Sequence, residues 1–246
     1  MYQLTKMIQR DFLNLLINPT WLFFCLMFPF LLITIVSFMT QGMYSDSFTS
    51  YDYYGVTLMF YSALYSGTFA ANSFMEERIK KANLRGIYAP NCEWKIPFSK
   101  TIATFLYTLI IYSFVAVLVS ILFSINYGAA LFQLWLLFVG VNLASSSFGV
   151  FMCCLFKSEG VANQILSVLT SIVAITAGLL FPAAAMGPAF SKVSQWMPLS
   201  KVIQAAFELI YDSHSQYFLL AFIGSLLVAL VFTLLSQLLF KGEAYV

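Results

Sequence analysis

The chain has 246 residues, of which 61% are hydrophobic and only 9% are charged, and its formal net charge is +2. Soluble domains carry about 25% charged residues, so this composition excludes a water-facing surface over most of the molecule. The small net charge gives no reason to expect nucleic acid as a partner. We therefore predict an all-α integral membrane protein that forms a single transmembrane domain over residues 1–246.

The chain opens on an amphipathic segment that leads into the first apolar run. In residues 3–18 the apolar face is formed by Leu4, Ile8, Phe12 and Leu15, and the polar face by Lys6, Gln9 and Arg10. This pattern predicts an interfacial helix over residues 1–18, stopped by Pro19. Residues 21–39 are long enough to cross a bilayer, because about 20 apolar residues span its hydrocarbon core. No small-x-small cleavage site follows, so we do not expect a cleaved signal peptide.

Five further apolar segments bring the predicted number of transmembrane helices to six. Residues 101–156 carry no charge and are too long for one helix, and the turn sequence INYGA divides them at 125–129. The five later spans are predicted at 54–75, 101–124, 130–156, 161–182 and 215–240. Small residues predict close helix contacts at Ser62, Ser66 and Ala70, at residues 142–149, and at Ser167, Ser171 and Gly178.

The distribution of Lys and Arg predicts the orientation of the chain in the membrane. With the N-terminus inside, only Lys192 and Lys201 lie outside. The ten basic residues on the cytoplasmic side are Lys6, Arg10, Arg78, Lys80, Lys81, Arg85, Lys95, Lys100, Lys157 and Lys241. We therefore predict a multi-pass protein of the cell (plasma) membrane with both termini in the cytoplasm.

Residues 76–100, between the second and third spans, hold nine of the 22 charged residues (12 basic and 10 acidic). Good helix formers follow the second span without a break, and Gly86 then ends the helix. The segment is thus predicted to form a short, charged cytoplasmic hairpin. Apolar Ile79, Leu84 and Ile87 among the charges favour a docking surface for a partner protein. A solvated loop that only orients the protein is the alternative.

Residues 183–212, between the fifth and sixth spans, are too polar to cross a membrane and too apolar for an ordinary loop. Prolines at 182, 188 and 198 divide them into two short extracellular helices, which we expect either to lie in the outer leaflet or to dip into it as re-entrant helices. Within them, Trp196, Pro198 and Phe207 are the candidate residues of an extracellular gate. A passive structural lid is the alternative.

The charged segment carries a resemblance to a known family. Residues 75–102, MEERIKKANLRGIYAPNCEWKIPFSKTI, resemble the segment after the second helix of ABC-2-type permeases, the membrane subunits of a class of ABC transporters. Glu77, Pro90 and Lys100 stand at the family's acidic cluster, its proline and its lysine before the third span. KKANLRG departs from the family's usual Gly-Thr-Leu-Glu-x-Leu. The resemblance extends over the whole chain, from the N-terminal helix ending in Asn-Pro to the segment before the last span.

The resemblance implies a coupling helix between spans two and three that docks on a separate ATPase subunit. Its candidate contacts are Glu76, Glu77, Arg78, Lys81, Leu84, Arg85, Ile87 and Pro90. The chain has no G-x-x-x-x-G-K-[ST] motif, so it is expected to be no enzyme and to bind no cofactor or metal itself. ATP and Mg would be bound by two copies of the ABC ATPase. A second permease, identical or paralogous, and membrane lipid complete the expected partners.

Two other classes of membrane protein compete with a permease as interpretations of this sequence. A secondary carrier or channel that is not driven by ATP is the main alternative, but an ion-driven carrier is expected to hold ionisable residues at membrane depth. None is predicted in any span here. An intramembrane protease would need several histidines, and the chain has one, His214. The apolar, aromatic-rich and Met-rich interior favours export of a drug, an antimicrobial peptide or a lipid-like molecule, although contact with lipid alone would explain the same composition.

Overall fold

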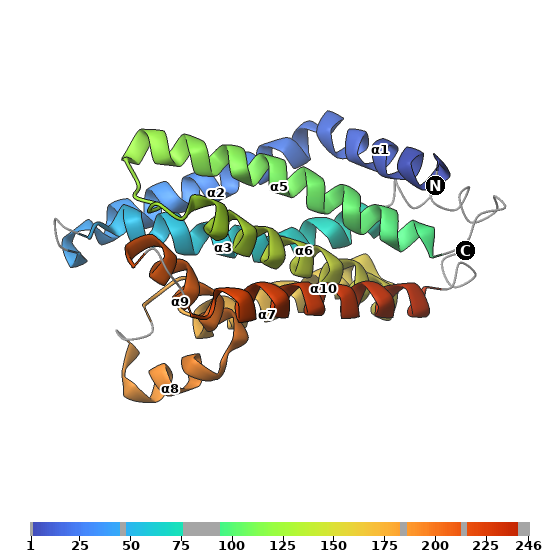
Figure 1. Ribbon diagram of the computed structural model, residues 1–246. Helices are drawn as coiled ribbons and strands as arrows, with labels where there is room; N and C mark the ends of the chain where they lie inside the picture. The colour runs from blue at the N-terminus through green and yellow to red at the C-terminus, as the bar shows by residue number, and fades with distance from the viewer. Residues whose placement is uncertain (1, 45–47, 76–93, 183–185, 213–215, 241–246) are drawn as a thin grey trace.

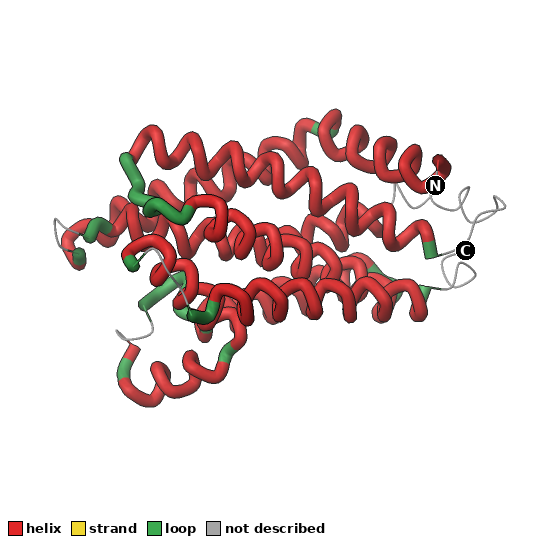
Figure 2. The backbone as a smooth tube through the Cα atoms, viewed as in Figure 1, coloured by secondary structure: helices red, strands yellow, loops and turns green. Residues whose placement is uncertain are grey.

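The computed structural model describes residues 2–44, 48–75, 94–182, 186–212 and 216–240. Across these ranges the chain is helical, and its long helices lie along one another in a bundle (Figure 1, Figure 2). The elements are α1 (Tyr2–Ile17), α2 (Pro19–Thr40), the 3-10 turn η1 (Gln41–Met43), α3 (Ser50–Met75), α5 (Lys95–Phe123), α6 (Leu131–Phe156), α7 (Glu159–Thr176), α8 (Pro188–Trp196), α9 (Pro198–Tyr211) and α10 (Phe218–Leu239).

Five of the described helices are long and apolar enough to cross a membrane. They are α2 with its 3-10 extension, α5, α6, α7 and α10. The remaining predicted span corresponds to α3, which has 26 residues but is rich in Ser, Tyr and Gly. Most of α3 is buried, and it packs on α2, α5, α6 and α7, so its surroundings are protein rather than lipid. The multi-pass architecture is therefore supported, while the count of six stays a prediction that depends on α3.

The boundary between α1 and α2 is set by local signals. Asn18 lies between the two helices, and its side chain accepts a hydrogen bond of 3.1 Å from the backbone N–H of Thr20. Pro19 occupies the first turn of α2, where its missing N–H would have had no helical partner. The sequence prediction that the first helix stops at Pro19 is confirmed.

Two span boundaries differ most from the sequence predictions. Helix α5 begins at Lys95 rather than at 101, and α7 ends at Thr176 rather than at 182. The end of α7 is a Schellman motif, in which Gly178 has φ +79° and the N–H of Leu179 donates to the carbonyl of Ala174 at 2.9 Å. Gly178 therefore ends α7 rather than lying inside the predicted span, and it is buried at this end of the helix.

Helices α3 and α6 approach each other closely. Gly67 and Gly149 face each other, and a Cβ atom added at Gly149 would lie 1.9 Å from the carbonyl oxygen of Gly67. Ser62, Ser66 and Ala70 are fully buried along α3, as the small-residue spacing predicts. The predicted contact at 142–149 is likewise confirmed. In α7, however, Ser167 and Ser171 are exposed on the isolated chain, so they do not pack within it.

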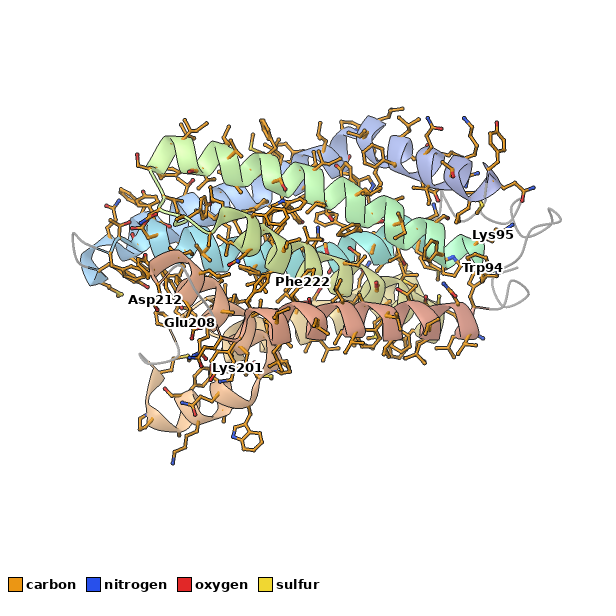
Figure 3. The ribbon with its side chains drawn as sticks, in the orientation of Figure 1. Trp94, Lys95, Lys201, Glu208, Asp212 and Phe222 are labelled. Carbon is orange, nitrogen blue, oxygen red and sulfur yellow. The ribbon has the colours of Figure 1, made fainter. Side chains whose placement is uncertain are left out.

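The two ends of the bundle carry different elements. The start of α1, the start of α5 and the end of α10 lie at one end, whereas α8 and α9 lie toward the other (Figure 1). In Figure 3, Trp94 and Lys95 accordingly lie at the end opposite to Lys201, Glu208 and Asp212. This arrangement agrees with the division of charges used to predict orientation.

Candidate functional site

The predicted coupling residues lie outside the part of the chain that the structure describes. They are Glu76, Glu77, Arg78, Lys81, Leu84, Arg85, Ile87 and Pro90, all within the segment from 76 to 93 that joins α3 to α5. The helices on either side of this segment are described. Both belong to the packed centre of the bundle, because α3 and α5 contact each other and both contact α2 and α6.

A buried ion pair joins α1 to the first turns of α5. The Nζ atom of Lys100 lies 2.9 Å from Oδ1 of Asp11, and both side chains are almost completely buried. Ser99 donates a hydrogen bond of 3.3 Å to the other carboxylate oxygen. Arg10, whose side chain is half exposed, lies 3.4 Å from the same Oδ1 atom as Lys100. A buried carboxylate is stable only with such partners, so the pair fixes α1 against α5.

Sequence reasoning missed this pair, although a signal was present. Asp11 lies on the same helical face as Leu4, Ile8 and Leu15, so it interrupts an otherwise apolar stripe. Lys100, which was predicted to precede the third span, lies in the first turns of α5, because this helix begins five residues before it. The expectation that no ionisable residue lies at membrane depth stays a prediction. Helix α1 also runs beside α5, where Phe12 contacts Tyr107 with 6.4 Å between ring centroids. Its interfacial position in a membrane stays a prediction.

The end of the bundle opposite to the start of α5 is built by α8 and α9 (Figure 1). Pro188 and Pro198 occupy the first turns of these helices, as the proline spacing predicts. Helix α9 buries its apolar side on the bundle through Val202, Ile203, Ala205, Ala206, Leu209 and Ile210. The two short helices are thus confirmed, while their insertion into a membrane stays a prediction.

The three predicted gate residues are not brought together. The ring of Phe207 stacks on that of Tyr53 in α3, with 5.5 Å between centroids and 10° between planes. The Tyr53 hydroxyl in turn donates to the carbonyl of Gly178 at 2.6 Å. Trp196, at the end of α8, is 89% exposed on the isolated chain. Pro198 lies between them along the chain and begins α9.

Two neighbouring cavities lie beside α9, and one residue lines both. The first, which we call the lateral cleft, has a volume of about 530 Å³ and lies between α7 and α10 over α6. The second, which we call the outer pocket, has a volume of about 300 Å³ and is bordered by the end of α7 and by α8 and α9. Lys201 lines both. Pro198 borders the lateral cleft and Phe207 the outer pocket.

A third cavity, of about 450 Å³, lies between α5 and α6. In the wall of this cavity, the indole N–H of Trp135 donates a hydrogen bond of 3.2 Å to the Ser113 hydroxyl. The Tyr127 hydroxyl is buried without a hydrogen-bond partner among the described residues. Burial raises the pKa of Tyr127 above its ordinary value, so this hydroxyl stays a neutral donor near pH 7. The lateral cleft and the cavity between α5 and α6 suit apolar molecules that carry few polar groups.

Comparison with known proteins identifies the chain's family. The sequence model described as ABC-2 family transporter protein matches residues 43–238, from η1 nearly to the end of α10. The chain belongs to the ABC-2 family. It is therefore a permease, the membrane subunit of an ABC transporter, and members of this family work with an ABC ATPase. The match begins after α1 and α2, so it does not cover the N-terminal part of the resemblance. No curated protein matches the chain.

Proposed function

We propose that this ABC-2 permease exports an apolar or amphipathic molecule by alternating access, driven by two copies of a separate ATPase. A second permease, identical or paralogous, completes the transporter, and ATP and Mg are bound by the ATPase subunits. The observation that carries the proposal is the position of residues 76–100. This segment connects α3 and α5, which pack on each other and on the helices around them. A movement of this segment would therefore be transmitted through α3 and α5 to the helices that pack on them.

The role of ATP in this proposal is thermodynamic. ATP binding can shift the permease only by favouring one of its conformations, and the docked segment transmits that preference. The buried Asp11–Lys100 pair supports this role, because it ties α1 to the first turns of α5, where residues 76–100 end. The cavities beside α5, α7 and α10 are mostly apolar, which supports an apolar or amphipathic cargo.

Charge reversal in the coupling segment tests the link to the ATPase. We expect Glu77→Lys and Arg85→Glu to reduce copurification of the ATPase and substrate-stimulated hydrolysis, with normal insertion and abundance of the permease. Lys192→Glu is the matched control, because Lys192 is exposed on α8 at the other end of the bundle. Exposed substitutions without a partner are usually worth no more than about 0.5 kcal/mol. Normal assembly and transport in both coupling variants would show that the segment is only a solvated loop.

We also propose that residues 183–212 form an outer gate that keeps cargo from returning. Trp196→Ala and Phe207→Ala are expected to uncouple ATP hydrolysis from export while ATPase binding stays intact. Trp196 gives the cleaner test, because a side chain that is 89% exposed contributes little to folding of the single chain. Hydrolysis and export should be measured on the same reconstituted variants. Normal coupling in both would favour the passive lid.

The proposed orientation places α8 and α9 outside the cell and both termini in the cytoplasm. In a variant without native cysteines, we expect Gln216→Cys to react with a membrane-impermeant thiol reagent on intact cells. Gln9→Cys should react only after the cells are opened. Both positions are exposed on the chain, so burial does not limit either reaction. The opposite labelling pattern would invert the orientation.

A further inference from the structure

We propose that the lateral cleft and the outer pocket together bind an anionic amphiphile, with its apolar chain in the cleft and its anionic head group at Lys201. The shared chemistry is that of a fatty acid or an anionic phospholipid. This proposal goes beyond the transport function, because such a molecule would bind the permease whether or not an ATPase is attached.

The lateral cleft has the shape and lining that an apolar chain requires. Helices α7 and α10 each pack on α6, and the space between them is closed at one end by the first turn of α9. Leu169, Leu220 and Val228 line the cleft and are also exposed, so it opens at the surface of the chain. Its volume of about 530 Å³ falls within the range of about 300–1,000 Å³ that is usual for ligand sites.

Gly224, in the middle of α10, widens this cleft. Glycine in a helix interior costs roughly 0.5–1 kcal/mol relative to alanine, so it usually meets a packing need. At Gly140 and Gly149 that need is plain, because an added Cβ would lie 2.2 Å and 1.9 Å from neighbouring atoms. At Gly224 a Cβ would meet nothing within 4 Å. The space that a side chain would fill belongs to the cleft, which Gly224 lines.

Lys201 supplies the charge at the mouth of the cleft. Among the described residues that line the cleft and the outer pocket, Lys201 is the one that carries a charge. Its Nζ atom lies 3.4 Å from Oε1 of Gln204 and 5.1 Å from the centre of the Tyr217 ring. Within the described residues, no carboxylate lies within 4.0 Å of it. A half-buried ammonium without a counter-ion, beside an apolar cavity, favours an anion that carries an apolar chain.

The outer pocket, on the other side of Lys201, suits a polar head group. Ser194, Ser200 and Gln204 line it and offer hydroxyl and amide donors. The hydroxyls of Ser194 and Ser200 lie 3.0 Å apart, which links α8 to α9 at this point. Lys201 lies near the start of α10 in Figure 3, and it lines both the apolar cleft and the outer pocket. Polar and apolar parts of one ligand would thus meet at Lys201.

The proposal can be tested by measuring how a spin-labelled fatty acid binds to the purified full-length permease without ATPase. Bound probe is measured as the immobilised fraction of the spin-label spectrum. Lys201→Gln should weaken binding about tenfold or more, since charge-assisted hydrogen bonds are among the stronger polar contacts. Lys201→Arg should keep most of the affinity, and Gly224→Leu should abolish binding by filling the cleft. The matched controls are Lys192→Gln and Gly160→Leu, because Lys192 lines neither cavity and a Cβ at Gly160 also meets open space. Both controls should bind as the parent does.

Competition experiments distinguish the two possible ligands, a free fatty acid and an anionic phospholipid. Phosphatidylglycerol displacing the probe while phosphatidylcholine does not would identify an anionic phospholipid as a ligand, and displacement only by unlabelled fatty acid would identify the free acid. Unchanged binding in Lys201→Gln or in Gly224→Leu would overturn the proposal. A change of oligomeric state in Gly224→Leu with unchanged binding would also overturn it and assign the cleft to a contact between permeases. Either result would leave the proposed transport function standing, because that proposal is tested separately by copurification of the ATPase.

Discussion

Replacing Lys100 by methionine is expected to lower the free energy of unfolding by about 3 kcal/mol, because it leaves the carboxylate of Asp11 buried without its main cation. Asp11 is 1% exposed, so water cannot replace that partner. Arg10 remains 3.4 Å from Oδ1 of Asp11, but its side chain is half exposed, so it compensates the buried carboxylate less well than Lys100 does. Thermal unfolding of the purified protein in detergent, followed by circular dichroism, would measure the effect.

Two further variants separate the ion pair from simple packing. The double variant Asp11→Leu with Lys100→Met should recover most of the lost stability, because an apolar pair of similar volume often replaces a buried ion pair without loss. Arg10→Gln should change the free energy of unfolding by no more than about 0.5 kcal/mol. A double variant less stable than Lys100→Met alone would show that the pair does not act as a unit.

The second large effect is expected at the contact between α3 and α6. Gly149→Ala should destabilise the protein by about 1–3 kcal/mol or more, because its Cβ would lie 1.9 Å from the backbone oxygen of Gly67 and the helices would have to separate. The same contact carries hydrogen bonds, among them one of 3.2 Å from the Gly67 N–H to the Ser145 hydroxyl. Separation would weaken these as well.

Function should respond to the same change. Helix α3 ends at Met75, directly before the proposed coupling segment, so a shift of α3 relative to α6 would move that segment. We therefore expect Gly149→Ala to lower substrate-stimulated ATP hydrolysis in the reconstituted transporter. Gly160→Ala is the matched control, because its Cβ meets open space, alanine favours the helix and Gly160 lines none of the three cavities. Equal melting temperatures for the two variants would contradict the close contact.

Local signals predicted the described elements well where a single stretch of chain decides the structure. Asn18 and Pro19 end one helix and begin the next through their own side chains, and Pro188 and Pro198 do the same for α8 and α9. Long apolar runs predicted the spanning helices, because a bilayer requires backbone hydrogen bonds to be satisfied within the segment. For α7 the run of apolar residues continued past the helix, and Gly178 ended it first.

Partners that are distant in sequence could not be predicted in this way. Asp11 and Lys100 are 89 residues apart, and only the packing of α1 along α5 brings them together. The lateral cleft likewise exists because α7 and α10 both pack on α6 while α9 folds back to close one end. Periodicity shows which face of a helix is apolar, but it does not show which helix covers that face.

The sequence by itself determined that this protein is helical and membrane-embedded, and its charged segment at 76–100 already resembled that of its family. Composition and periodicity suffice for this, because lipid imposes the same demand on every spanning segment. Only the tertiary structure decided that Lys100 is neutralised by Asp11, that Gly67 meets Gly149, and that Lys201 stands at the mouth of an apolar cleft. These features depend on distances between helices, which are fixed when side chains from several segments pack against one another.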